Sequence, residues 1–187
     1  NPTFGFEQRA QQPVIETAAG FYANGVIVHI SAADGAEIHY TTDCSTPTRT
    51  SPLYTGPISI SATTVIRAIA CAPDQLCSAV AGATYFINDS SPVPVVSLYT
   101  DNTYLFDDST GVMVKGTGRT PNYMKNLQYP CQLEYFDENG QLGICQIGTF
   151  KIAGKTMRTG KQKSLAVYAR KAYGSDTFGY PLFEDRD

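Results

Sequence analysis

The chain has 187 residues, a formal net charge of −3 at pH 7 and 42% hydrophobic residues. This length predicts one medium domain or two small ones, and the hydrophobic content excludes wholesale disorder. Only 17% of the residues are charged, while 12 Tyr and 9 Phe favour β structure. No apolar run approaches the roughly 18 residues that a membrane helix needs. We therefore expect a mostly β protein without a membrane segment.

The charge is unevenly distributed along the chain. Three basic and seven acidic residues precede Pro92, and no acidic residue lies between Glu138 and Asp176. Such a change in surface charge within one chain predicts two units. We expect an N-terminal tail at 1–13, a first unit at 14–88, a stiff polar linker at 89–94 and a second unit at 95–187. The stretch between Glu138 and Asp176 contains seven basic residues: Lys151, Lys155, Arg158, Lys161, Lys163, Arg170 and Lys171.

Nucleic acid is not an expected partner of this basic stretch. The aromatic residues needed for base stacking are sparse there, and the pI of the chain is near 5.3.

Two pairs of cysteines are placed for local disulfide bonds. Cys71 and Cys77 flank a short turn-like stretch, and Cys131 and Cys145 flank a predicted hairpin. If that hairpin turns at Glu138, Cys131 and Cys145 face each other across its two strands. Local bridges predict an extracytoplasmic protein, secreted or at the cell surface.

Other cysteine arrangements remain open at this point. Cys44 is left over, and it could instead capture Cys71 or Cys77. All five cysteines could also be buried, unpaired thiols. No CxxC pair is present, so a structural zinc site is not expected.

The first unit alternates short β-like runs with turn residues. The runs cover residues 26–30, 37–41, 64–70 and 79–87, and Asn, Gly, Pro and Asp separate them. Short strands with regular turn signals predict a small antiparallel sandwich.

Three stretches of this unit carry a recognisable pattern, at residues 40–48, 51–58 and 64–68. Together they resemble the immunoglobulin-like domain of the chitobiase/β-hexosaminidase C-terminal type. The resemblance implies a non-catalytic accessory module beside extracellular catalytic or surface domains. Cys44 stands where that family usually has Gly, which questions the turn conformation because Gly adopts a positive φ at low cost.

Carbohydrate binding is the alternative to a spacer role for this unit. Sugar platforms usually need exposed aromatic faces, and Tyr22, Tyr40, Tyr54 and Tyr85 are available. Tyr40 and Tyr85 lie in predicted strands, where packing is the commoner role. The sequence therefore favours a spacer.

Two groups of residues could be taken for a metal site and for a phosphate-binding loop, but neither has the arrangement that such a site requires. His29 and His39 lie on separate predicted strands, so we expect no metal site. Gly154-Lys155-Thr156 lacks the GxxxxGK[ST] spacing of a phosphate loop. We expect no catalytic residue in this chain.

The second unit is also mostly β-like, with runs at 95–99, 112–114, 132–136, 144–153 and 164–170. Alternation in the last run places Lys163 on the same face as Leu165 and Val167. A Lys on an apolar face needs an anionic partner or must reach solvent at the strand end. The candidate partners are a nucleotide phosphate and a carboxylate such as Glu134.

Residues 93–187 contain motifs that resemble the N-terminal part of the CotH-type (spore coat protein H-like) kinase family. The carrying pieces are 105–107 with 111–112, 133–137 with 139–140, and 158–174, in which 162–165 and 168–170 are the most specific. The resemblance implies a protein-kinase-like fold that transfers the γ-phosphoryl group of ATP, with Mg²⁺, to Ser residues of a surface or coat protein. It also implies that Lys163 contacts phosphates, with Arg158 as a helper.

Phosphoryl transfer also needs a positioning carboxylate and acidic Mg²⁺ ligands, normally from a second lobe. Asp185 and Asp187 could imitate such ligands, but at the end of the sequence we expect them to be solvated. The expectation is a spacer sandwich followed by the nucleotide-side portion of a kinase, inactive alone, from an extracytoplasmic surface or coat protein. A non-catalytic adhesion, structural or carbohydrate-binding module is the alternative.

Overall fold

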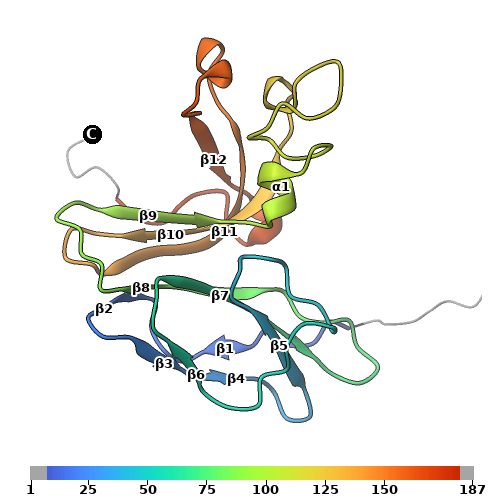
Figure 1. The fold of residues 1–187 in the computed structure, drawn as a ribbon. Helices are drawn as coiled ribbons and strands as arrows, with labels where there is room; N and C mark the ends of the chain where they lie inside the picture. Colours follow the sequence, from blue (N-terminus) through green and yellow to red (C-terminus); the bar gives the residue numbers. More distant parts are fainter. Residues whose placement is uncertain (1–7, 182–187) are drawn as a thin grey trace, which may run out of the picture. The chain divides into compact units, whose positions relative to one another are not determined.

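The computed structural model describes residues 8–181 and divides the chain into two compact units between Ser91 and Pro92. Both units consist mainly of antiparallel strands joined by turns (Figure 1). The predicted mostly β fold class is therefore confirmed. Among the described residues, no helix has the length and apolar character needed to cross a membrane.

The first unit is a sandwich of short strands in two layers (Figure 1). One layer has four strands in the order β2 (Gly20–Tyr22), β8 (Ala81–Ile87), β7 (Thr64–Cys71) and β5 (Glu37–Thr41). The other consists of two pairs, β1 (Val14–Ile15) with β4 (Ile30–Ser31), and β3 (Val26–Val28) with β6 (Ile58–Ile60).

Alternating side chains fill the space between these layers. In β7, Ile66, Ala68 and Ala70 are fully buried, and Ile66 and Ala68 pack in one cluster with Val28 of β3 and Tyr85 of β8. Burying a Val or Ile side chain of this kind contributes roughly 2 kcal/mol. Ile66, Ala68 and Ala70 follow the period of two expected for one face of a strand, while Ile69 and Cys71 on the other face of β7 are buried as well.

One strand pair departs from the predicted antiparallel sandwich. β2 runs parallel to β8, with Gly20 opposite Tyr85 and Tyr22 opposite Ile87. β1, β2 and β6 have only two or three residues each. Runs this short show no measurable alternation, so the sequence carried no signal for them or for their direction.

The second unit contains one four-stranded antiparallel sheet (Figure 1). Its order is β12 (Leu165–Ala169), β11 (Leu142–Ile152), β10 (Tyr129–Phe136) and β9 (Val95–Tyr99). Four short helical segments lie between or after the strands: α1 (Asn102–Phe106), η1 (Asn122–Met124), η2 (Thr156–Thr159) and η3 (Lys171–Tyr173).

The strand expected at 112–114 does not form. The backbone N–H groups of Val112 and Met113 instead donate to the carbonyls of Tyr104 and Leu105 at the helix α1. Val112 is 1% exposed and packs with Phe150 and Ile152 of β11. The apolar run therefore serves the core from a loop, which strand periodicity alone does not distinguish from a strand.

The β10–β11 hairpin has a different register from the one expected. In the turn, the N–H of Asp137 donates to the carbonyl of Gln141, so the turn is centred one residue beyond Glu138. A bulge at Tyr135/Phe136 shifts the register of the two strands further. The expected Cys131–Cys145 bridge is wrong as a result. Cys131 lies opposite Gly148 and Cys145 lies opposite Glu134, so the two cysteines are out of register and on opposite faces of the sheet.

Candidate functional site

Lys163 lies just before β12, at the edge of the sheet. Its ammonium donates to the carbonyl of Gly160 at 2.8 Å and sits 4.7 Å from the centroid of the Tyr123 ring. The carboxylate alternative, Glu134, is fully buried in β10. Lys163 thus meets a neutral carbonyl and an aromatic face, and it forms no ion pair within residues 8–181.

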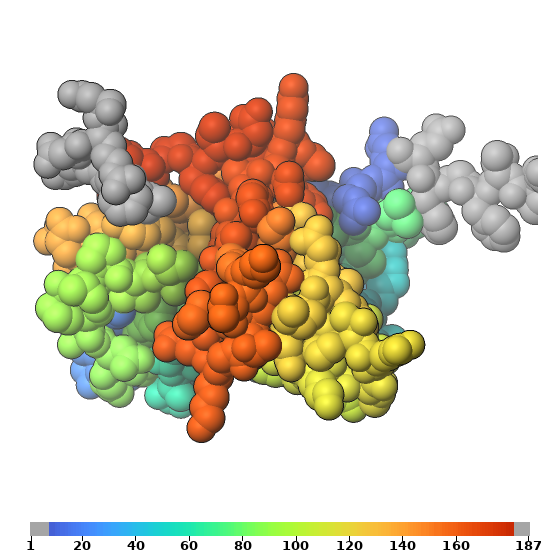
Figure 2. Space-filling model, turned by 90° about the horizontal axis from the view of Figure 1, so that it is seen from above, coloured from blue at the N-terminus to red at the C-terminus, as the bar shows by residue number. Residues whose placement is uncertain are grey.

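Arg158 belongs to η2 and reaches across to η1. Its Nε donates to the carbonyl of Gly154 at 2.7 Å, and Nη1 approaches the carbonyls of Lys125 and Met124 at 3.4 and 3.5 Å. η1 and η2 are in contact, and Figure 2 shows the yellow segment around residue 120 beside the orange segment around residue 155. The two residues expected to contact phosphate therefore meet at the same turn.

A third cation and a buried amide complete this turn. Asn122 is 1% exposed; its N–H donates to the carbonyl of Lys115 and its Nδ2 to that of Asp108, both at 2.9 Å. Its Oδ1 accepts a 2.6 Å hydrogen bond from Nζ of Lys125. Asn122 could not be predicted from the sequence, because an Asn in a polar loop carries no periodic signal.

We call Lys125, Arg158 and Lys163 the η1 cationic cluster. Each of the three donates to neutral oxygen atoms, and none has a carboxylate partner in the described part of the chain. Their positive charge is therefore not neutralised locally. Asp185 and Asp187 lie outside the described residues.

The first unit contains a disulfide bond between Cys71 and Cys77, one of the two local pairs that the sequence suggested. The bond closes a loop at the end of β7. An open groove of about 510 Å³ lies beside it. Its lining consists of Arg9, Thr46, Pro47, Thr48, Arg49, Ile69, Gln75, Leu76, Cys77, Ser78 and Val80.

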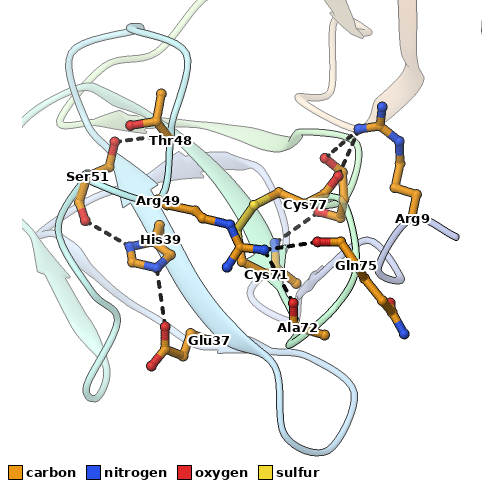
Figure 3. The surroundings of a disulfide bond; sticks show 12 residues. Arg9, Glu37, His39, Thr48, Arg49, Ser51, Cys71, Ala72, Gln75 and Cys77 are labelled. Atoms are coloured by element: carbon orange, nitrogen blue, oxygen red, sulfur yellow. Dashed lines mark hydrogen bonds and ion pairs between the residues drawn. A yellow bond between two sulfur atoms is a disulfide. The ribbon is translucent and has the colours of Figure 1, made fainter. Parts of the chain in front are cut away.

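Two arginines hold the disulfide loop by its carbonyls (Figure 3). Nη2 of Arg49 donates to Ala72 and Gln75 at 3.2 and 3.0 Å. Nη1 of Arg9 donates to Cys77 at 2.8 Å and to Ser78 at 3.2 Å. The backbone beside Arg9 pairs with Leu76, so residues 8–12, expected in a tail, lie against this loop.

The tyrosines considered as a sugar platform are all packed against the core. Tyr85 is fully buried, and Tyr22, Tyr40 and Tyr54 pack on the same cluster as partly buried residues. Three of the four hydroxyls are also engaged: Tyr85 donates to Thr17, Tyr22 donates to Ala18, and Tyr54 accepts from Ile30. Packing is therefore their observed role.

Both ring nitrogens of His39 have partners nearby, Ser51 and Glu37. Nδ1 donates to the carbonyl of Ser51 at 2.9 Å, and Nε2 lies 3.8 Å from the Glu37 carboxylate (Figure 3). Among residues 8–181 no three His, Cys, Asp or Glu side chains gather closely enough to hold a metal ion.

The three free thiols are poor nucleophiles. Burial raises the pKa of Cys131 to about 12. Burial also raises the pKa of Cys145, and the nearby Glu134 carboxylate raises it further. Burial raises the pKa of Cys44 as well, although the positive charge of Arg67 offsets part of this rise. Since the thiolate is the reactive form, none of them has the lowered pKa of a catalytic cysteine.

One family model matches the sequence. It is described as chitobiase/beta-hexosaminidase C-terminal domain and covers residues 17–82, which lie entirely within the first unit. The sandwich is thus similar to an accessory domain associated with carbohydrate-active enzymes. A comparison with curated proteins finds no match.

Proposed function

We propose that this chain is a non-catalytic portion of an extracytoplasmic surface or coat protein. In this proposal the first unit is a spacer, and the second is the N-terminal, nucleotide-side part of a CotH-like kinase domain. The observation that carries the proposal is the η1 cationic cluster. It contains Lys163 and Arg158, the two residues that the resemblance assigns to phosphate binding, together with Lys125, and none of the three has a carboxylate partner among the described residues.

The contacts of Lys163 leave its ammonium group able to bind an anion. Its ammonium donates to one neutral carbonyl, that of Gly160. A phosphate oxygen would form a charge-assisted hydrogen bond, about twice as strong as a neutral one. The guanidinium of Arg158 lies at the same turn and is held by Gly154. Mg²⁺-ATP is the ligand that the resemblance implies, with Lys163 and Arg158 holding its phosphates.

The packing of the first unit supports the spacer role. Its tyrosines stabilise the core, so they do not offer stacking faces to a sugar. The three basic residues before Pro92 all donate to backbone carbonyls of the same unit. These contacts stiffen the loops, as a module that separates or positions other domains requires.

The Cys71–Cys77 bond supports an extracytoplasmic location. Disulfides persist in oxidising compartments and are rare where glutathione keeps thiols reduced.

Titration of Mg²⁺-ATP into the protein, followed by calorimetry, tests the proposal. We expect weak binding that falls roughly tenfold in Lys163→Met, since one charge-assisted contact is lost. Lys171→Met is the matched control, because Lys171 is an exposed cation of the same basic stretch. We also expect no phosphate transfer to added Ser-containing protein.

Equal affinities of the two variants would remove Lys163 from the site, and no binding at all would overturn the nucleotide-side role. Phosphate transfer by this chain alone would overturn its non-catalytic role.

A further inference from the structure

The groove beside the disulfide has the size and lining of a small-ligand site. Its volume of about 510 Å³ falls within the roughly 300–1,000 Å³ of such sites. Leu76, Pro47 and Val80 give it an apolar surface, and Leu76 is 47% exposed there. Thr48 and Gln75 add a hydroxyl and an amide group.

The two arginines of the groove are held in place with donors to spare. A guanidinium has five N–H donors on three nitrogens. Arg49 uses only Nη2 and Arg9 only Nη1 for the hydrogen bonds that fix them to the loop (Figure 3). The other nitrogens have no partner within the described residues. Because the side chains are already ordered, a ligand would bind them at little entropic cost.

The charge of the groove favours an anion. Its lining contains two cations and no Asp or Glu. Fixed guanidinium groups match carboxylates, which they bind through paired N–H···O bonds.

The backbone of the groove disfavours an extended peptide. The N–H of Leu76 already donates to Gln8, and its carbonyl accepts from Ala10. The N–H of Ser78 donates to Ala70. A peptide that adds as a strand needs free backbone groups of this kind. A saccharide needs side-chain donors, acceptors and small apolar surfaces, which are what the groove offers.

We propose that this groove binds an acidic oligosaccharide, with uronate carboxylates of the chain bound separately by the free N–H groups of Arg9 and by those of Arg49. Its hydroxyls meet Thr48 and Gln75, and a ring face lies on Leu76. This goes beyond the spacer role and is independent of nucleotide binding by the second unit. The first unit would then anchor the protein to an acidic polysaccharide while it spaces its neighbour.

Binding to the intact chain is measured by calorimetry with three probes: a galacturonic acid tetramer, a neutral galactose tetramer and a tetraglutamate peptide. We expect the uronate tetramer to bind at low salt and the other two to bind at least about tenfold more weakly. Equal binding of tetraglutamate would reduce the groove to a general anion site and overturn the saccharide assignment. No binding of the uronate would overturn the site itself.

Variants locate the binding. Arg49→Lys keeps the charge but removes the planar fork, and it should weaken uronate binding roughly tenfold. Arg119→Gln, a change at an exposed arginine of the second unit, should not. Gln75 contacts Arg49 through its backbone carbonyl and not through its side chain, so Gln75→Ala tests the groove without loosening the loop. Unchanged uronate affinity in both Arg49→Lys and Gln75→Ala would place the ligand elsewhere.

Discussion

Nη1 of Arg67 donates to the carbonyl of Cys44 at 2.7 Å and thereby ties β7 to a turn in the left-handed region, with φ of 64° at Cys44. Non-glycine residues are uncommon at such φ values and add strain. The same guanidinium contacts the hydroxyl of Thr46 at 3.3 Å. The turn is therefore held from outside in a conformation that Cys44 itself disfavours.

We predict that Cys44→Gly is more stable than Cys44→Ala by about 1 kcal/mol. Both variants remove the thiol, but only Gly adopts the positive φ without strain from a Cβ atom. Urea unfolding of the two variants measures the difference. Equal free energies of unfolding would show that the Arg67 contact leaves no strain at this turn.

Removal of the disulfide should destabilise the first unit. The bond joins residues six positions apart, and closing so short a loop contributes about 2 kcal/mol in the chain-entropy model. We expect Cys71→Ala/Cys77→Ala to lose about this much in urea unfolding. Adding a reducing agent to the unmodified protein should reproduce the loss but leave the double variant unchanged. An unaltered free energy of unfolding in both experiments would contradict the prediction.

Asn122 should be the most sensitive polar residue of the second unit. Asn122→Ala leaves the Asp108 carbonyl with only its longer hydrogen bond from the Thr117 N–H and removes the amide oxygen that accepts from Lys125, at a cost of about 1–3 kcal/mol. Asn126→Ala, an exposed site in the same loop, is the matched control and should change the free energy of unfolding little. Similar losses at both positions would show that Asn122 is not the centre of this loop.

The long strands could be predicted from the sequence because their pattern is local. The alternation over 64–70 predicts the burial of Ile66, Ala68 and Ala70, but not that of Ile69 on the other face of β7. The resemblance at 40–48 and 51–58 lies within the matched family domain. Burial on one face of a sheet makes a period of two readable without any knowledge of the partner strands.

The site geometry could not be predicted because it depends on contacts far apart in the sequence. Arg9 meets Cys77, and Arg158 meets Lys125, only after the chain has folded. The predicted Cys131–Cys145 pairing was wrong because the turn is displaced by about one residue and because a bulge shifts the register further. A small error in register moves a side chain to the other face, so a pairing argument is only as good as the turn on which it rests.

The free thiols should alkylate in an order set by their exposure and pKa. Cys145 is exposed, but its raised pKa leaves less thiolate at pH 8 than an ordinary cysteine has. We expect iodoacetamide to label it slowly at pH 8 and faster as the pH rises toward about 10, because the thiolate fraction grows. Cys131 is 4% exposed and has a pKa of about 12, so it should stay unlabelled in the folded protein over this range.

Mass spectrometry of peptides after timed alkylation measures both rates, and urea-unfolded protein provides the control in which Cys131 reacts. Cys71 and Cys77 should remain unlabelled without a reducing agent, since they form the disulfide. Rapid labelling of Cys131 in the native protein at pH 8 would contradict its burial in the core of the second unit. Recovery of Cys131 and Cys145 in one cross-linked peptide would contradict the register of the hairpin, because that register puts the two sulfur atoms on opposite faces of the sheet.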